Sequence, residues 1–207
     1  MVKTLTFLKE AVRANRSTGA IAPSSRHLAE KVTDLAGVPR ADVIVEYGPG
    51  TGVFTETILR KKKPDARFIA MEVNETFVKA TRERCPDATV IHDGAQNAAR
   101  YLREMGCTHC DAIVSGLPWT NFDAALQDEI LDATYDVLAP GGRFVTFAYV
   151  FSPVMPAGRR FLLHKLPAKF GRVSATRVVW GNLPPCAVYI ADKPRDGAAA
   201  AGRKETS

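Results

Sequence analysis

The stretch that decides the fold is Val43-Ile44-Val45-Glu46-Tyr47-Gly48-Pro49-Gly50-Thr51-Gly52. Its three β-formers, residues 43–45, predict a buried parallel strand, and the glycines that follow allow the backbone to turn sharply beside a ligand. The apolar periodicity of residues 54–59 predicts a helix that opens after this turn. A strand, a glycine turn and a helix N-terminus in this order form a pocket of the nucleotide-binding kind.

The glycine spacing and the acid before the turn indicate which ligand this pocket takes. The dinucleotide fingerprint G-x-G-x-x-G would place its third glycine at Val53, whereas the third glycine here is Gly52. Glu46 would repel a pyrophosphate, but it suits a ligand that carries an ammonium and a sulfonium. We therefore expect S-adenosylmethionine as the cofactor and S-adenosylhomocysteine (SAH) as its product. The alternative is an α/β domain whose glycine turn holds no cofactor.

Two later segments also end in acids. Residues 68–72 predict a strand that ends at Glu72, where a ribose-binding carboxylate belongs, and residues 89–94 predict one that ends at Asp93, suited to an adenine edge. In this order and spacing, the three segments resemble motifs one to three of the Rossmann-like, class I methyltransferases. The expected cofactor-binding residues in the described motifs and in the turn after the fourth strand are Glu46, Gly48, Gly50, Thr51, Gly52, Glu72, Val73, Asp93, Gly94, Ala95 and Ser115.

Strand and helix patterns alternate through the rest of the chain. Helices are expected over residues 26–36, 74–84, 95–105 and 124–138, the last ended by the turn Pro140-Gly141-Gly142. Further strands are expected over residues 111–114, 143–149, 177–180 and 187–190. The predicted fold is α/β: a Rossmann-like methyltransferase with a doubly wound, mostly parallel seven-stranded sheet and an N-terminal helical extension. Ligands should lie at the carboxyl ends of its strands.

The chain is expected to have three parts. Residues 1–25 hold an amphipathic helix and a loop of small residues that closes over the cofactor, with Ser24 and Ser25 as cofactor-binding residues. The helix places Leu5, Phe7 and Leu8 on one arc, so it either lies on a membrane or packs on the core, and both alternatives stay open. Residues 26–192 form the methyltransferase domain, and residues 193–207 are expected to be a disordered tail.

Composition and charge limit the class of protein. The 207 residues suffice for one domain with a substantial core, and the absence of a signal pattern or a long apolar run predicts a cytoplasmic protein without a transmembrane segment. The net charge of +6 divides into +4 over residues 1–31, +7 over residues 153–207 and −5 between them. An anionic membrane surface and nucleic acid both fit the basic flanks. Cys107-Thr108-His109-Cys110 has no second pair, so no metal site is expected.

Further segments make the resemblance more specific. Together with the glycine loop, they look like the bacterial phospholipid N-methyltransferases, which methylate phosphatidylethanolamine towards phosphatidylcholine. These segments are Gly19-Ala20 with Pro23-Ser24-Ser25, Ser115-Gly116-Leu117-Pro118 and Asn182-Leu183-Pro184-Pro185. The resemblance covers residues 5–191. It implies methylation of phosphatidylethanolamine and its mono- and dimethyl forms by a monomer, which binds phospholipid headgroups and the anionic inner face of the cell membrane peripherally.

The neighbouring family, the ribosomal RNA adenine dimethyltransferases, supplies the alternative function. Its turn after the fourth strand is typically Asn-(Leu/Ile)-Pro-(Tyr/Phe), in which the polar residue holds a planar amine and the aromatic ring stacks on a flipped base. Here Ser115 and Gly116 replace the asparagine pattern, while an aromatic residue remains at Trp119. This departure disfavours nucleic acid as the partner and leaves room for a flexible primary amine.

The expected catalytic residues are Tyr149, Ser115 and Leu117. Methyl transfer runs in line from sulfonium to amine, so the main work of the enzyme is positioning. Tyr149 accepts or relays a proton, orients the amine or packs in the core, and these alternatives stay open. Methylated amines remain cationic and suit aromatic rings, and a guanidinium suits the lipid phosphate. The expected substrate-binding residues are Trp119, Tyr149, Arg177, Trp180 and Asn182.

Overall fold

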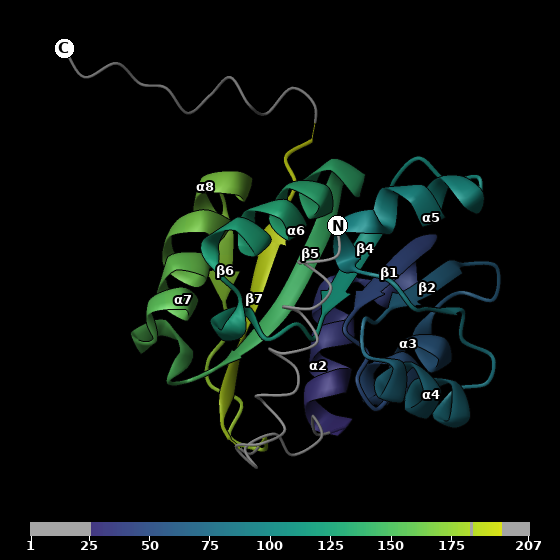
Figure 1. The fold of residues 1–207 in the computed structure, drawn as a ribbon, viewed down its shortest axis with the longest axis horizontal. Helices are drawn as coiled ribbons and strands as arrows, with labels where there is room; N and C mark the ends of the chain where they lie inside the picture. The colour runs from purple at the N-terminus through teal and green to yellow at the C-terminus, as the bar shows by residue number, and fades with distance from the viewer. Residues whose placement is uncertain (1–25, 183, 196–207) are drawn as a thin grey trace.

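A computed structural model describes residues 26–182 and 184–195 of the chain. A seven-stranded sheet runs through the molecule with helices on both faces (Figure 1). The strand order is β3-β2-β1-β4-β5-β7-β6; β7 pairs antiparallel with β5 and β6, and all other pairs are parallel. The predicted doubly wound, mostly parallel sheet is confirmed. The helix and loop expected over residues 1–25 lie outside the described residues.

The elements have the following bounds. The strands are β1 Val43–Tyr47, β2 Arg67–Met71, β3 Val90–Ile91, β4 Cys110–Ser115, β5 Leu138–Tyr149, β6 Val173–Ala175 and β7 Cys186–Asp192. The α-helices are α2 Arg26–Ala36, α3 Val53–Lys61, α4 Glu75–Arg84, α5 Ala98–Glu104, α6 Ala124–Val137, α7 Pro156–Arg159 and α8 Leu166–Phe170. The short 3₁₀ helices are η1 Val38–Arg40, η2 Ala95–Asn97, η3 Trp119–Asn121 and η4 Ser152–Val154. The segment η5 Arg160–Lys165 is a π-helix. None of the described helices is long and apolar enough to cross a membrane.

Side chains of the central strands alternate between two cores. In β1, Val45 and Tyr47 enter the core beneath α5, α6 and α8, whereas Ile44 enters the core beneath α2, α3 and α4. Glu46 points to the same side as Ile44, where it meets Thr55 of α3. Because strand side chains alternate, this direction is set by sequence position alone. It places the first acid of the glycine stretch next to the helix that the loop opens.

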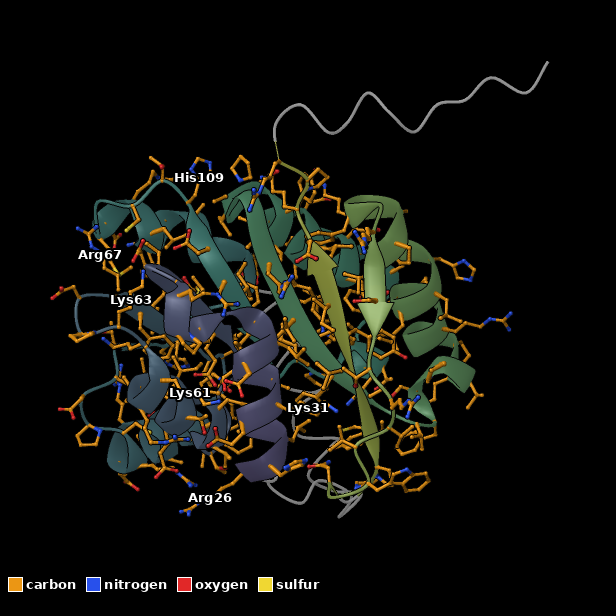
Figure 2. The ribbon with its side chains drawn as sticks, turned by 180° about the vertical axis from the view of Figure 1, so that it is seen from behind. Arg26, Lys31, Lys61, Lys63, Arg67 and His109 are labelled. Carbon is orange, nitrogen blue, oxygen red and sulfur yellow. The ribbon has the colours of Figure 1, made fainter. Side chains whose placement is uncertain are left out.

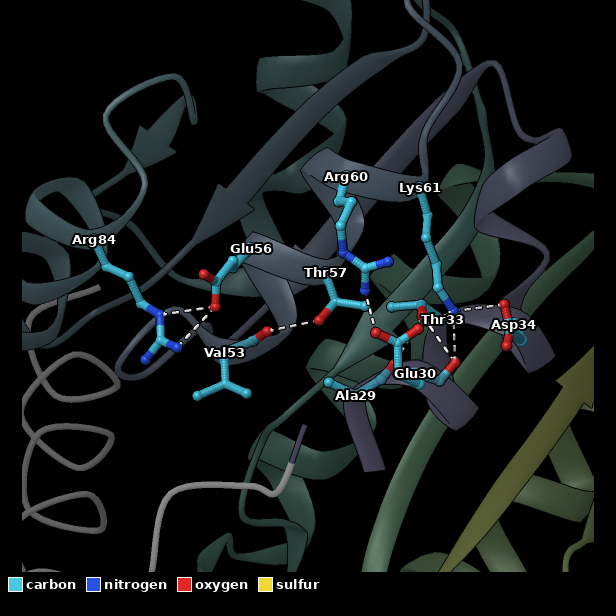
Figure 3. A network of polar contacts seen from close by, with 10 residues as sticks. All are labelled: Ala29, Glu30, Thr33, Asp34, Val53, Glu56, Thr57, Arg60, Lys61 and Arg84. Atoms are coloured by element: carbon cyan, nitrogen blue, oxygen red, sulfur yellow. Dashed lines mark hydrogen bonds and ion pairs between the residues drawn. The ribbon is translucent and has the colours of Figure 1, made fainter. Parts of the chain in front are cut away.

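Ion pairs hold α3 between α2 and α4 on the outside of the molecule (Figure 3). Lys61 of α3 lies 2.7 Å from Glu30 and 2.6 Å from Asp34 of α2, and Arg84 of α4 lies 2.8 Å from Glu56 of α3. The hydrogen bond from Lys61 lowers the pKa of Glu30, and that from Arg84 lowers the pKa of Glu56. The acids are largely exposed, so these pairs orient the helices more than they stabilise the fold.

The expected strand over residues 177–180 is wrong. The sixth strand is β6, in which Val173 pairs with Ala191 of β7. Residues 177–180 contribute only an isolated bridge between Val179 and Cys186. Arg177-Val178-Val179-Trp180 is the more β-prone sequence, but pairing with an existing strand outweighs propensity.

Two other expectations were incomplete. No helix was expected over residues 156–170. In the structure α7, η5 and α8 follow one another without a break; Pro156 begins this run, where no amide donor is needed, and Pro167 follows the wider turns of η5. The expected turn at residues 140–142 lies inside β5. There the pairing with β4 shifts register, and Gly141 takes a φ of +80°, which favours glycine.

Candidate active site

The glycine loop between β1 and α3 is formed by three residues in the left-handed region. Gly48, Gly50 and Gly52 have φ angles of 67°, 59° and 81°. Residues with a Cβ rarely adopt such angles, so the loop needs glycine at these positions. Thr81 of α4 donates a hydrogen bond to the Gly50 carbonyl at 2.9 Å and holds the loop from outside.

The turn after β4 packs directly on this loop. The Gly116 amide donates to the Tyr47 carbonyl at 2.7 Å. A Cβ at Gly48 would lie 3.0 Å from Cδ2 of Leu117, and a Cβ at Gly116 would lie 2.6 Å from the Gly48 carbonyl. A side chain at Gly116 would therefore collide with backbone. The two expected motifs form one continuous edge, and Gly116 is required by their close approach.

Glu46 is fully buried beneath the glycine loop. Its Oε2 accepts a hydrogen bond from the Thr55 hydroxyl at 2.7 Å, while Oε1 has no partner among the described residues. Burial raises the pKa of Glu46 to about 8, against the opposing effect of the Thr55 hydrogen bond. A buried acceptor without a donor is costly, and a ligand ammonium would remove that cost. The site therefore fits the amino-acid end of S-adenosylmethionine.

Glu72 lies just beyond β2, against the same loop. Its Oε1 accepts from the Asn74 amide at 2.9 Å, and Oε2 accepts from the Gly50 amide at 3.3 Å. The side chain is 5% exposed, and burial raises its pKa. The bond to Gly50 is long, so a donor with better geometry, such as a ribose hydroxyl, fits this oxygen. The adjoining Val73 is also buried.

The carboxylate of Asp93 is engaged by its own neighbours. Oδ1 accepts from the Gly94 amide at 2.8 Å and from the Asn97 amide group at 2.9 Å, while Oδ2 accepts from the Tyr101 hydroxyl at 2.9 Å. Beside it lies Gln96, whose buried Oε1 has no partner among the described residues. A second acceptor thus stands at the expected adenine position. No motif in the sequence singled out Gln96.

The expected catalytic residues lie at the carboxyl edge of β4 and β5. Ser115 is fully buried; its Oγ accepts from the Leu117 amide at 3.4 Å, and its carbonyl accepts from the Thr146 hydroxyl at 3.1 Å. Tyr149 ends β5, three residues after the strand partner of Ser115, or roughly 10 Å further along. It is half-buried, burial raises its pKa, and its ring stacks on Phe151.

Two expected substrate-binding side chains are buried. Trp119 is 4% exposed, stacks on Phe161 with ring centroids 3.8 Å apart and donates from Nε1 to the Thr146 hydroxyl. Its ring belongs to the core and offers no open face to a cationic substrate, which corrects the expectation for this residue. Asn182 is 3% exposed and donates to the Pro184 carbonyl at 2.9 Å, so it holds the connection between β6 and β7.

The remaining expected residues have different surroundings. Trp180 is 78% exposed, and Arg177 is exposed without a guanidinium partner recorded among the described residues. Ser24 and Ser25 lie outside the described part of the chain. Cys107 and Cys110 are buried free thiols, and the described residues hold no cluster of three metal-binding side chains.

Comparisons with known proteins agree with this geometry. Residues 44–142 match the family described as "Methyltransferase domain". The chain is 32% identical over 143 residues to an ornithine lipid N-methyltransferase of Singulisphaera acidiphila, an alignment that covers 67% of this chain and 73% of that protein. It is 33% identical over 132 residues to ribosomal RNA small subunit methyltransferase A of Thermotoga maritima, covering 63% of this chain but only 45% of that protein.

A solved structure supports the fold. The O-methyltransferase from Bacillus cereus, in complex with SAH, superposes with a TM-score of 0.65 at 18% identity, covering 91% of both chains. Its similarity concerns the architecture alone. The chain belongs to the class I methyltransferases and uses S-adenosylmethionine as its cofactor.

Proposed function

We propose that this enzyme methylates the primary amine of a membrane lipid headgroup, converting phosphatidylethanolamine and its mono- and dimethyl forms towards phosphatidylcholine. The observation that carries the proposal is the 32% identity to an ornithine lipid N-methyltransferase over 73% of that protein. An ornithine lipid and phosphatidylethanolamine both present a primary amine at the head of a lipid. Lipid amine is therefore the substrate class, and ornithine lipid is a second candidate within it.

The cofactor site would use side chains from three strand ends. Glu46 would pair with the ammonium of the cofactor, Glu72 with the ribose hydroxyls, and Asp93 together with Gln96 with the adenine edge. When bound, S-adenosylmethionine supplies a methyl group that is made electrophilic by the sulfonium. The buried positions of Glu46 and Glu72 exclude water from these contacts, which strengthens them.

The turn after β4 offers one acceptor for the substrate amine. The carbonyls of Ser115, Leu117 and Pro118 accept hydrogen bonds from Thr146, Trp119 and Asn121, respectively. Among the described residues, no donor is recorded for the Gly116 carbonyl. This oxygen can accept an N–H of the substrate and aim the nitrogen lone pair at the methyl group.

Tyr149 would orient the amine from the other side. Because burial raises its pKa, the phenol keeps its proton at neutral pH and does not serve as a base. Its oxygen can still accept an N–H, and its ring can face the cationic methylated products. The ammonium of the substrate then loses its proton to water before attack. Arg177, which is exposed on the β6–β7 connection, would meet the lipid phosphate.

The test is methyl transfer from labelled S-adenosylmethionine to defined acceptors. Vesicles of phosphatidylcholine would carry phosphatidylethanolamine, ornithine lipid or neither, and ribosomal RNA would serve as a separate acceptor. We expect label in amine lipid only, with successive methylated products resolved by chromatography. Label in RNA adenine with none in lipid would reject the proposal in favour of nucleic-acid methylation.

A further inference from the structure

One segment of the chain combines apolar exposure with an extreme charge bias. Residues 137–191 contain no Asp or Glu but seven Lys or Arg. Within the described residues, every large apolar side chain that is classed as exposed also falls in this segment. These side chains are Val150, Phe151, Val154, Met155, Leu163 and Trp180. Apolar patches of this kind on a soluble protein usually mark an interaction site.

The loop after β5 holds its apolar side chains outward by its own backbone. Two turn bonds shape it: the Val154 amide donates to the Phe151 carbonyl at 3.1 Å, and the Met155 amide donates to the Ser152 carbonyl at 3.2 Å. Ser152 is buried, and Gly158 packs so closely on its carbonyl that a Cβ would lie 2.2 Å away. With this inner side anchored, Val154 is left 80% exposed. The backbone of the loop therefore fixes its apolar side chains in exposed positions.

The strand pairing brings Trp180 to the same end of the sheet. Tyr149 pairs with Cys186 in β7, and Cys186 in turn bridges to Val179. Trp180 follows Val179, and Val150 follows Tyr149, so both lie just beyond one row of paired residues. The Val150 amide also donates to the Pro185 carbonyl at 3.0 Å. The apolar loop and Trp180 thus border the edge at which the expected substrate turn opens.

The cations of this segment include both paired and unpaired side chains: Arg143, Arg160, Lys165 and Lys169 are bound by other residues. On the α2 face, shown in Figure 2, Lys61 and Lys63 are bound by Asp34 and Asp42, and Arg67 donates to the Met105 carbonyl. By contrast, three exposed arginines of the acid-free segment have no guanidinium partner recorded within residues 26–182 and 184–195. These are Arg159, Arg172 and Arg177. Their charge is available to an external anion.

We infer that this surface, the interfacial rim, docks the enzyme on an anionic lipid bilayer; we define it as Val150, Phe151, Val154, Met155, Trp180, Arg159 and Arg177. Arg172 is not part of it, because the adjoining Val173 pairs with Ala191 at the other end of β7. The inference rests on the proposed function and assigns the surface through which that function reaches its substrate. Apolar side chains enter the headgroup boundary, and the surrounding arginines meet lipid phosphates. RNA fits less well, because single strands stack their bases on several aromatic faces, whereas Trp180 is accompanied mainly by aliphatic side chains and Phe151 already stacks on Tyr149.

Vesicle sedimentation tests the interfacial rim without any amine lipid. The full chain should sediment with vesicles of phosphatidylcholine and phosphatidylglycerol, and more weakly as salt rises. The variant Phe151→Ser, Val154→Ser, Met155→Ser should lose at least about 100-fold in partitioning, because three apolar groups no longer enter the boundary. Its affinity for SAH, measured by calorimetry, should stay that of the parent and shows that the fold is intact.

A charge-matched pair separates docking at the rim from general attraction. Arg159→Gln with Arg177→Gln should weaken binding about 25-fold, or about fivefold for each charge. Lys79→Gln with Arg100→Gln removes the same charge from α4 and α5, which precede and follow β3, the outermost strand on the side of the sheet away from β7 and β6. This variant should leave binding almost unchanged. Equal losses from both pairs would overturn the rim as the docking surface.

The outcomes for docking and for function are distinct. If the apolar variant binds vesicles like the parent while the parent methylates amine lipid, the rim is not the docking surface and the proposed function is retained. If the parent and the variants bind vesicles as expected but the parent transfers no methyl group to any amine lipid, the rim is retained as the docking surface and the proposed function is rejected. A parent that binds RNA but no vesicle contradicts the rim directly.

Discussion

Replacing Glu46 with glutamine should remove a pH-dependent cost of folding. Burial raises the pKa of Glu46 to about 8 from an ordinary value of 4.5. Between these values the unfolded chain has lost the proton while the folded chain keeps it. The free energy of unfolding of the parent therefore falls by about 1.4 kcal/mol for each pH unit. Across the interval the loss amounts to roughly 5 kcal/mol. Below pH 4.5 both states are protonated, so the contribution of Glu46 is fully retained there.

Urea unfolding at several pH values measures this effect. Glu46→Gln keeps the shape of the side chain but cannot titrate, so the stability of the parent relative to the variant should decline as pH rises from about 5 to about 8. Glu83→Gln, exposed on α4, is the matched control and should follow the parent at every pH. If the difference between parent and Glu46→Gln stays constant over this range, the buried carboxyl does not titrate as argued.

The same group should couple cofactor binding to pH. A carboxylate that pairs with the cofactor ammonium must first lose the proton that Glu46 holds below about pH 8. SAH affinity should therefore rise about tenfold per pH unit between about pH 6 and 7.5, where the ligand amine still keeps its own proton. Calorimetry in two buffers of different ionisation enthalpy detects the released proton. A parent that releases none, or a Glu46→Gln variant with the same slope, would contradict the assignment.

Three further substitutions test individual residues. Glu72→Gln should weaken SAH binding at least tenfold, because hydrogen bonds to a charged acceptor contribute about 1.5–3 kcal/mol each; unchanged affinity by calorimetry would remove Glu72 from the site. Tyr149→Phe should lower kcat for methyl transfer to amine lipid about tenfold at unchanged SAH affinity, since only the orienting hydroxyl is lost; an undiminished initial rate would leave Tyr149 as packing. Trp119→Ala should reduce the free energy of unfolding by about 3–5 kcal/mol in urea, and a variant of parental stability would contradict its core position.

The part of the molecule that binds the cofactor was predictable because its sequence patterns lie within short stretches of the chain. Helix α2 has the predicted bounds Arg26–Ala36, and all three glycines of the quoted stretch have positive φ. Glu46 and Glu72 needed no knowledge of distant contacts, since each stands at the end of an apolar strand in the chain itself. Parallel strands then bring their carboxyl ends to one edge. The roles assigned to these acids stay predictions.

The substrate half was less predictable because its contacts join distant residues. The aromatic ring of Trp119 is covered by Phe161, which lies in a helix that the sequence pattern does not indicate. Pairing with β7 selects Val173–Ala175 as a strand over a more β-prone neighbour. Gln96 gains significance only because the donors around Asp93 already occupy that carboxylate. None of these facts has a local signature.

The division of charge between these halves resolves a conflict in the proposed chemistry. A cationic cofactor requires acids, whereas an anionic lipid surface is repelled by them, and both must meet at one edge of the sheet. Glu46 and Glu72 are buried, and burial raises the pKa of Glu46 to about 8, so below that pH Glu46 adds no negative charge beneath the surface that faces a membrane. Near the same edge, the segment that lacks acids supplies Arg159 and Arg177, which have no partner recorded within the described part of the chain. Burial of the acids therefore serves both ligands: it strengthens their contact with the cofactor cation and leaves the outer surface positive for the lipid.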